Sequence, residues 1–273
     1  MPVTALLLAL AAAFVHALWN VLLARARDTA AATAIMLVVA TVVFAPVAAV
    51  VWRADGSVWP YVAGSSCLEV AYFALLAFGY ARGELSLVYP LARGSAPVLV
   101  LLFGAVVLGT ATSAAQAVGV VLVAVGIVLV RGLGRVTPAR GVAVALAIGG
   151  CIAAYTLIDK GGVRHANPIT YLELVMLGPA VVYTAAVTRT RGLGALRAAF
   201  GTSTIVAGIA TFGGYVLALA ALQRASAASV AAVRETSVVI AAALAAVVLH
   251  ERVGRLRVAG VCLVVAGIAA LSR

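Results

Sequence analysis

The sequence predicts an all-α integral membrane protein, with ten transmembrane helices arranged as two inverted five-helix repeats. Three observations lead to this fold class. Of the 273 residues, 65% are hydrophobic and only 10% are charged, a composition that soluble domains do not have. Apolar stretches long enough to cross a bilayer follow one another with short links between them. The second half of the sequence also weakly repeats the first.

Ten candidate spans are found with a window of span length. The links between them are short and carry turn residues or charges, so we expect no separate soluble domain. The expected helices cover residues 3–24, 29–52, 60–81, 85–108, 112–130, 138–159, 168–188, 202–223, 227–249 and 254–271.

The internal repeat appears when the chain is shifted against itself by 141 residues, which aligns Arg93 with Arg234. The same shift aligns GVVLVAVGI in the fifth span with GVCLVVAGI in the tenth. Because each half holds five helices, an odd number, the second half must enter the membrane from the opposite side. We therefore expect an inverted repeat, with one unit in residues 1–131 and the other in 138–273.

The stretch from 85 to 108, LSLVYPLARGSAPVLVLLFGAVVL, places Arg93 inside a span, between Pro90 and Pro97. A charge at membrane depth costs at least about 2.5 kcal/mol and normally faces a cavity or a partner. Each proline also leaves the carbonyl four residues earlier without its helical donor. These three positions share one face, which predicts a polar site. The alternative is a kinked packing helix with Arg93 neutralised by a buried carboxylate.

These features resemble the drug/metabolite transporter superfamily, and in particular its ten-helix EamA-type members. The resemblance extends over nearly the whole chain and is carried by HALWNVLLAR, YARGELSLVYPLARGSAPV, ALQRASAASVAAVRETSVV and LHERV. It implies two inverted repeats around a central cavity, lined mainly by helices one, three, four, six, eight and nine. Gly109 and Thr110 stand where a Gly-Glu pair is common in the family, which weakens a transport role for Glu251.

Charged side chains inside the expected spans are few: Arg93, Arg234, Glu235, Glu69 and Glu173. Arg234 lies as deep in its helix as Arg93, so an inverted-repeat axis would place both at one midplane cavity. Two arginines there suit a substrate with a carboxylate, because the guanidinium fork makes paired hydrogen bonds. A structural salt bridge between Arg93 and Glu235 is the alternative for that pair.

The remaining acidic residues of the spans lead to different expectations. Glu69 lies near the centre of the third span, where it is a candidate proton-coupling group or equally a static partner of Arg93. Glu173 is shallow and is expected at the membrane interface. Asp159 and Lys160 end the sixth span and are expected to be solvated.

Aromatic and polar side chains complete the expected substrate site. His16 and Asn20 share one face of the first helix, although a lone histidine in a bundle is often only hydrogen-bonded packing. Aromatic rings beside charged groups can hold an organic solute through cation–π and apolar contacts, and helical aromatics can also simply pack. The aromatic candidates are Trp19, Tyr72, Tyr155 and Tyr215.

Paired glycines mark the fifth and tenth spans. Gly119 and Gly126, like Gly260 and Gly267, are two helical turns apart, a spacing that lets helix backbones approach closely. This pattern indicates either packing within the chain or a homodimer through these two helices. The three cysteines lie in apolar spans without CxxC or histidine at ligand spacing, so we expect no disulfide, metal or cofactor; they are Cys67, Cys151 and Cys262.

We expect a secondary active transporter that exports small organic metabolites, such as amino acids or related zwitterions, by alternating access at a midplane cavity. One alternative is a proton-coupled exporter of cationic drugs with Glu69 as the anionic site, and another is a passive pore. No HExxH, GxSxG or ATP-binding motif is present, which argues against an enzyme. The expected partners are a small-molecule substrate and the lipid bilayer, and not nucleic acid.

Two indications disagree about orientation. The net charge is +11, and most of the basic residues lie in short links after odd-numbered helices. The positive-inside rule places these links on the cytoplasmic side of a bacterial-type cell membrane. Both termini would then be outside, whereas the superfamily resemblance implies termini inside. The odd links carry Arg25, Arg27, Arg82, Arg131, Arg135, Arg140, Arg189, Arg191, Arg197, Arg252, Arg255 and Arg257, against Arg53, Lys160, Arg164, Arg224 and Arg273 on the other face.

Overall fold

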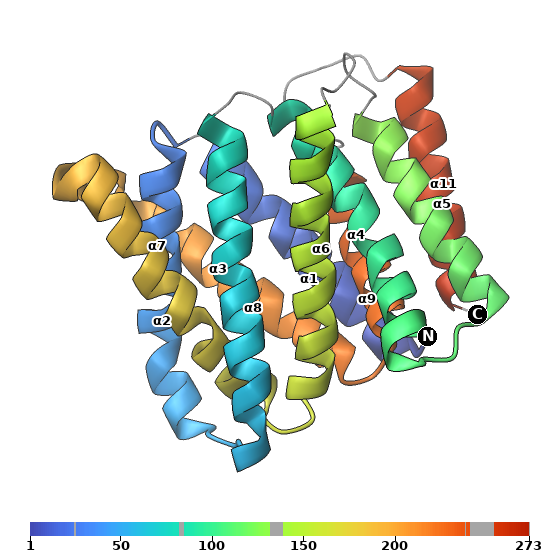
Figure 1. Ribbon diagram of the computed structural model, residues 1–273, viewed down its shortest axis with the longest axis horizontal. Helices are drawn as coiled ribbons and strands as arrows, with labels where there is room; N and C mark the ends of the chain where they lie inside the picture. The colour runs from blue at the N-terminus through green and yellow to red at the C-terminus, as the bar shows by residue number, and fades with distance from the viewer. Residues whose placement is uncertain (25, 82–84, 132–138, 238, 241–253, 273) are drawn as a thin grey trace.

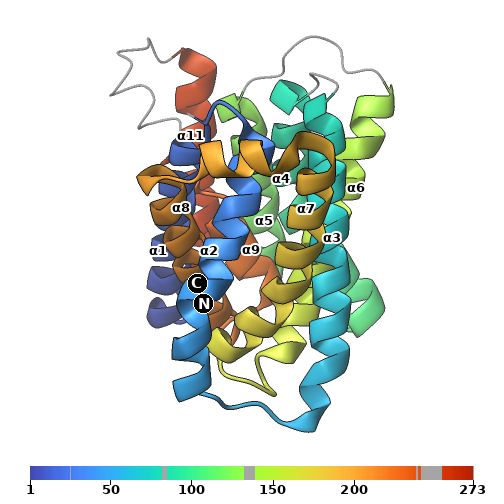
Figure 2. The same cartoon turned by 90° about the vertical axis from the view of Figure 1, so that its left-hand side faces the viewer.

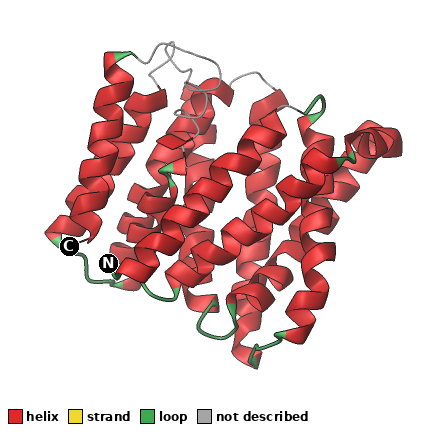
Figure 3. Cartoon of the chain, turned by 180° about the vertical axis from the view of Figure 1, so that it is seen from behind, coloured by secondary structure: helices red, strands yellow, loops and turns green. Residues whose placement is uncertain are grey.

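The computed structural model describes residues 1–24, 26–81, 85–131, 139–237, 239–240 and 254–272, which form a helical bundle (Figure 1). Among them the β pairing is a single isolated bridge between Ala54 and Ala166, so the bundle seen from behind is helix and loop (Figure 3). The predicted all-α class is confirmed. The helices are α1 (Val3–Ala24), α2 (Thr29–Val50), η1 (Gly56–Val58, 3-10), α3 (Trp59–Ala81), α4 (Leu85–Leu108), α5 (Ala114–Arg131), α6 (Ala139–Gly162), α7 (Pro168–Ala199), α8 (Thr202–Leu222), α9 (Ala227–Arg234) and α11 (Arg255–Ser272).

Six helices of the described chain are long and apolar enough to cross a membrane by length and composition: α1, α2, α4, α6, α7 and α8. Shorter apolar stretches, Ala114–Leu129 and Val258–Leu271, lie in α5 and α11. Successive long helices run in opposite directions, so both termini lie at the same end of the bundle (Figure 1). There the Met1 amino group donates to the Leu271 carbonyl at 3.3 Å.

The packing partners follow the pattern that a pseudo-twofold axis between two five-helix units produces. Helix α1 packs on α8, and its counterpart α6 packs on α3. Helices α2 and α7, which are counterparts of each other, pack together, as do α5 and α11. Corresponding helices of the two halves point in opposite directions (Figure 1), which is the geometry of an inverted repeat.

The glycines of α5 and α11 face each other within one chain. A Cβ atom added at Gly126 would lie 2.6 Å from the Gly260 carbonyl oxygen, and one added at Gly267 would lie 2.7 Å from that of Gly119. The two backbones therefore touch where these residues stand. The packing alternative accounts for the glycines, and any contact between two copies of the chain would have to use other faces of these helices.

Helix α7 is longer than the expected 168–188 because a second helical segment, which ends at Ala199, follows a kink in the link. Gly192 interrupts it with a left-handed φ of 78°, a conformation that glycine adopts without a Cβ penalty. The turns after this kink lie across the end of the bundle (Figure 2). A segment expected to be a loop is thus helical and carries exposed Arg197 on the bundle's end.

The expected continuous ninth helix is broken, which is a further correction. Helix α9 ends at Arg234, and the Glu235 N–H reaches back to the carbonyls of Ala231 and Val233. Thr236 donates both its N–H and its hydroxyl to Val233 O. A hydroxyl that competes for backbone carbonyls in this way favours a turn over a continued helix. Non-helical backbone at membrane depth is tolerated where protein or a cavity surrounds it.

Candidate functional site

A cavity of about 620 Å³ lies at the centre of the bundle. It is lined from both halves of the chain and extends to the end of the bundle at which α1 ends and α2 begins. Of the ten residues expected to form the substrate site, nine line it, and Glu235 lies directly behind Arg93. The nine are His16, Trp19, Asn20, Glu69, Tyr72, Arg93, Tyr155, Tyr215 and Arg234.

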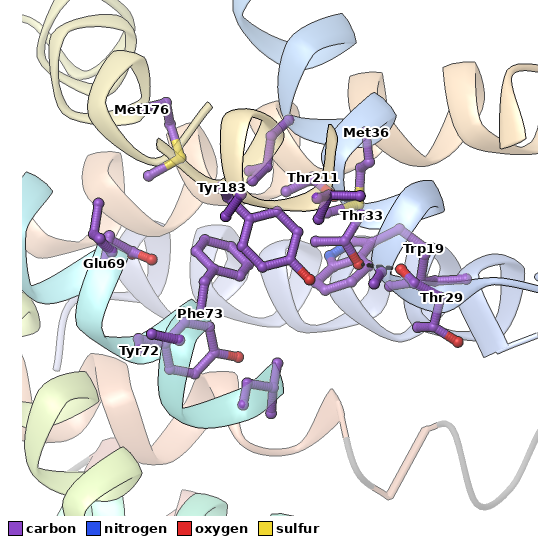
Figure 4. Close-up of a pocket in the computed structure, with 18 of the residues that line it drawn as sticks. Trp19, Thr29, Thr33, Met36, Glu69, Tyr72, Phe73, Met176, Tyr183 and Thr211 are labelled. Atoms are coloured by element: carbon purple, nitrogen blue, oxygen red, sulfur yellow. Dashed lines mark hydrogen bonds between the residues drawn. The ribbon is translucent and has the colours of Figure 1, made fainter. Parts of the chain in front are cut away.

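Helices α2 and α7 also line the cavity, which corrects the expected set of lining helices. From α2 come Thr29, Thr33 and Met36, and from α7 come Met176 and Tyr183. These side chains surround the space that Trp19 and Glu69 enter from α1 and α3 (Figure 4). Sequence reasoning missed them because threonine, methionine and tyrosine in an apolar helix look the same in sequence whether they face lipid or a cavity.

Arg93 is held by two partners at the wall of the cavity. Its Nη1 donates to Glu235 Oε1 at 2.8 Å, and its Nη2 lies 2.6 Å from His16 Nε2. Because a guanidinium only donates, His16 Nε2 is the acceptor. The two side chains of the salt bridge are 8% and 4% exposed. Arg93 therefore forms the structural salt bridge with Glu235 that was the alternative to a role in solute binding.

Arg234 is placed differently, although it is the repeat counterpart of Arg93. Its guanidinium carbon lies 5.1 Å from the ring centroid of Tyr215, within cation–π range. Among the described residues no carboxylate lies within salt-bridge distance of it. Arg234 is also the last residue of α9, where a cation stabilises the carbonyl end of a helix. Arg234 lines the cavity, and a guanidinium there can donate hydrogen bonds to an anion.

Asp159 corrects the expectation of a solvated residue. It is 1% exposed and accepts hydrogen bonds from Ser65 Oγ at 2.6 Å, Tyr171 OH at 2.8 Å and Tyr215 OH at 2.6 Å. Three hydroxyl donors satisfy a carboxylate that no cation pairs. Its position four residues after Tyr155, on the same helical face, is the feature of the sequence that could have indicated that Asp159 points into the bundle.

Tyr215 links Asp159 to the cavity. Its hydroxyl lies 3.2 Å from Glu69 Oε1 on the side opposite Asp159. Glu69 is 4% exposed over the whole residue and still lines the cavity. A static pair between Glu69 and Arg93, one of the two alternatives for Glu69, is not among the salt bridges of the described residues. The Tyr215 hydroxyl is the hydrogen-bond partner of Glu69 instead.

Lys160 and Glu173 also differ from expectation. Lys160 Nζ donates to the carbonyls of Leu222 and Ala225, so it caps the end of α8. Glu173 is 7% exposed, and its Oε2 has no hydrogen-bond partner among the described residues. It lies outside the cavity lining and is buried by protein, not placed at a solvated interface.

Aromatic rings form the walls between these charged groups. Tyr155 lies 6.3 Å from Tyr72 and 6.3 Å from Tyr215, measured between ring centroids. Phe73 and Tyr183 meet at 5.5 Å across the cavity from α3 and α7 (Figure 4). On α1 the His16 and Trp19 rings are 4.8 Å apart, and Asn20 Nδ2 donates to the His16 carbonyl. The Asn20 amide nitrogen is thereby used within its own helix.

The end of the bundle opposite the cavity mouth is closed by contacts between two links. Asn167 N donates to Arg53 O at 3.0 Å, and Asp55 N donates to His165 O at 2.9 Å. The His165 ring lies 3.1 Å from the Asp55 carboxylate. A hydrogen bond from the Ser57 backbone, together with that of His165, lowers the pKa of Asp55. We call Arg53, Asp55, His165 and Asn167 the closed-end contact.

No group of three or more His, Cys, Asp or Glu side chains able to hold a metal ion occurs in the part of the chain that the structure describes. Cys67, Cys151 and Cys262 are free thiols.

A bundle of apolar helices around a central cavity that both halves of the chain line is the architecture of a membrane transporter. Comparison with family models agrees, because the EamA-like transporter family matches residues 3–132 and again 139–273. The chain thus belongs to the EamA-like transporter family, part of the drug/metabolite transporter superfamily, whose members are transporters and not enzymes. The two matches suggest two repeats.

A solved structure supports the fold. A chain titled only "Crystal structure of protein" is 16% identical, with a TM-score of 0.76 over 99% of this chain and 96% of that one. At this identity the likeness concerns the fold alone. A search of curated protein sequences finds no significant match.

Proposed function

We propose that this protein is a secondary active transporter that exports small organic metabolites with a carboxylate and an amino group, such as amino acids or related zwitterions. The observation that carries the proposal is Arg234, a cavity-lining guanidinium without a carboxylate partner among the described residues. Glu69 contacts the Tyr215 hydroxyl, and Arg234 lies over the face of the same tyrosine ring. One small zwitterion can therefore meet an anion site and a cation site in the same cavity.

The two groups have complementary roles. The planar Arg234 fork suits a carboxylate, since it offers two parallel N–H donors. The Glu69 carboxylate can accept hydrogen bonds from the ammonium group of the solute. Between them, Tyr72, Tyr155 and Tyr215 supply aromatic surface for the apolar part of the solute. Burial of both charged ends would make binding selective, because a solute lacking one end leaves a buried charge unpaired.

Transport would proceed by rocking the two inverted repeats, residues 1–131 and 138–273, around this cavity. The mouth lies beside Arg27, Asp28 and Arg191, at links that follow odd-numbered helices. Their excess of arginine favours a cytoplasmic location for that end. The cavity would then collect its solute from the cytoplasm of a bacterial-type cell, in agreement with export across the plasma membrane.

An exporter of organic cations is the second candidate, favoured by the aromatic surroundings of Glu69 in Figure 4. A passive pore is disfavoured by the closed-end contact. Counterflow in proteoliposomes separates these functions. Vesicles loaded with one unlabelled amino acid should accumulate the same labelled amino acid transiently, because a carrier exchanges solutes and a pore does not.

The compounds for this assay come from a thermal-shift screen of purified protein against zwitterionic amino acids, simple carboxylates and organic amines. Stabilisation by amino acids, and weaker stabilisation by either single-charge class, is expected. Stabilisation by amines alone would replace the first candidate with the second. Equilibration of every compound without counterflow would contradict a carrier.

A further inference from the structure

We propose that a groove between α2 and α7, on the outer face of the bundle, binds one phospholipid, with an acyl chain along the groove and an anionic headgroup on Arg189. The groove has a volume of about 570 Å³ and, among the described residues, shares no lining side chain with the central cavity. The inference goes beyond the proposed function, since it does not depend on which solute is exported. The lining residues are Val38, Thr41, Leu177, Ala180, Val181, Thr184, Ala185, Thr188 and Arg189.

The groove faces the surroundings of the bundle. Val181 and Leu177 line it and are 67% and 46% exposed. The central cavity is lined by other residues of α7, among them Met176 and Tyr183. Helices α2 and α7 are both long and apolar enough to cross a membrane, so large apolar side chains exposed on their outer face meet lipid tails, which are as apolar as leucine.

The lining of the groove suits a hydrocarbon chain. Thr188 Oγ1 donates to the Thr184 carbonyl at 2.7 Å, and Thr41 Oγ1 donates to the Leu37 carbonyl at 3.1 Å. Thr184 Oγ1 is buried. These hydroxyl groups are therefore directed to their own helices or to the protein interior, which leaves methyl groups and aliphatic side chains to face the groove.

The length of the groove agrees with the depth of one leaflet. Leu177 and Arg189 are 12 residues apart in the sequence, which at a rise of 1.5 Å per residue corresponds to about 18 Å along α7. Half of the hydrocarbon core of a bilayer is about 15 Å thick. A groove that begins at Arg189, at the end of the apolar span, thus reaches about the middle of the membrane.

Arg189 supplies the charge that an anionic headgroup requires. It is exposed, and no carboxylate among the described residues lies within salt-bridge distance of it. The neighbouring Arg191 differs, because its Nη1 lies 3.9 Å from Asp28 Oδ2. A guanidinium pairs well with phosphate oxygens, and basic pockets between membrane helices bind anionic headgroups.

The segment after Arg189 places this charge at the membrane surface. Beyond the kink at Gly192, the end of α7 lies across the end of the bundle (Figure 2). It carries exposed Arg197, and the large apolar residues Leu193 and Phe200 are exposed beside it. Apolar and basic side chains together on an exposed segment are typical of the membrane interface. Arg189 therefore stands at the level of the lipid headgroups.

A lipid in the groove would act on the cavity mouth. Arg189 is followed directly by Thr190 and Arg191, and both line the cavity. Arg191 also faces Asp28, which caps the start of α2. A headgroup on Arg189 and an acyl chain between the two helices would thus brace α2 against α7 beside the mouth.

Native mass spectrometry of the purified full-length protein tests the headgroup. Palmitoyl-oleoyl phosphatidylglycerol, which is anionic, should bind more tightly than the phosphatidylethanolamine with the same acyl chains. Arg189→Gln should weaken binding of phosphatidylglycerol about fivefold, as expected for one basic residue beside an anionic lipid. Arg189→Lys should bind it as wild type does, because the charge is kept. The matched control is Arg197→Gln, an exposed arginine at the same end that does not line the groove. Equal binding by Arg189→Gln and wild type would overturn the proposal.

A second variant tests the acyl chain. Ala185→Leu fills the groove at an exposed position, so it should keep the thermal unfolding midpoint of wild type and bind both lipids more weakly. Ala49→Leu, exposed on α2 outside the groove, should bind both as wild type does. Unchanged lipid binding by Ala185→Leu would contradict the site. A wild-type dimer that Ala185→Leu converts to monomer would assign the groove to a second copy of the chain instead. No solute is added, so either result is separate from the outcome of the counterflow assay.

Discussion

Arg93 of α4 and Glu235, the residue after α9, form a buried 2.8 Å salt bridge between the two halves of the chain. The other end of the guanidinium contacts His16 of α1. One arginine thus connects three segments at the point where the ninth helix breaks. This arrangement favours a structural role for Arg93, and we propose that its repeat counterpart, Arg234, binds the solute.

Removing one partner of this bridge should destabilise the protein. Arg93→Ala and Glu235→Ala should each lower the unfolding free energy by about 3–5 kcal/mol, since each leaves a buried charge unpaired. The double variant should lose less than the sum of the two. Chemical unfolding in detergent measures the cycle. Additive losses would show that the two residues do not act as a pair.

Arg234→Lys should fold normally and bind its solute at least about tenfold more weakly, which corresponds to about 1.4 kcal/mol, because lysine keeps the charge but not the fork. Titration with the amino acid from the thermal-shift screen measures this. Arg224→Lys is the control, since exposed Arg224 bonds only the carbonyl of Ala220 at 2.7 Å. Equal affinity of Arg234→Lys and wild type would remove Arg234 as the anchor.

Gly126→Ala should cost about 1–3 kcal/mol of stability, as overpacking does. The added Cβ would lie 2.6 Å from the Gly260 carbonyl oxygen, so two helix backbones would have to separate. Gly150→Ala on α6 is the matched control, because its Cβ would have no atom within 4 Å. The thermal unfolding midpoint of the purified variants is the measurement. Equal midpoints would mean that α5 and α11 do not pack as described.

Asp55→Asn should favour opening of the closed end. The folded-state pKa of Asp55 is lowered from 3.8, so its contribution to the contact is present above that value and is lost as the pH falls through the lower folded value. At neutral pH the contact should therefore be intact in wild type and weakened in Asp55→Asn. Accessibility of a cysteine placed at Tyr61 measures the opening. Equal labelling of the two proteins at neutral pH would contradict the role of the contact.

The orientation suggested by charge can be tested in a background without Cys67, Cys151 and Cys262. In intact cells, an impermeant maleimide should label Gly56→Cys and not Gly194→Cys. Both glycines have open space around a new side chain. Gly56 stands just before α3 and Gly194 in the last turns of α7, and these two segments lie at opposite ends of the bundle (Figure 1). The reverse labelling pattern would place both termini in the cytoplasm, as the superfamily resemblance implies.

Much of this architecture could be predicted from the sequence. The bounds of α4 agree with those expected, and nine of the ten expected site residues line one cavity. Their function in binding stays a prediction. The errors occurred where the outcome depended on distant segments. Asp159 looked like a solvated helix end because its three hydroxyl donors come from α3, α7 and α8.

The sequence by itself determined the class of protein and the apolar segments that form helices, because membrane thickness and hydropathy are local constraints on each segment. Only the tertiary structure decided which charges are satisfied. Arg93 and Arg234 are equivalent in the repeat, yet among the described residues Glu235 pairs with Arg93 of the other half and not with Arg234, its neighbour in the chain. The pairing of buried charges depends on distances between helices, which no single segment of sequence contains.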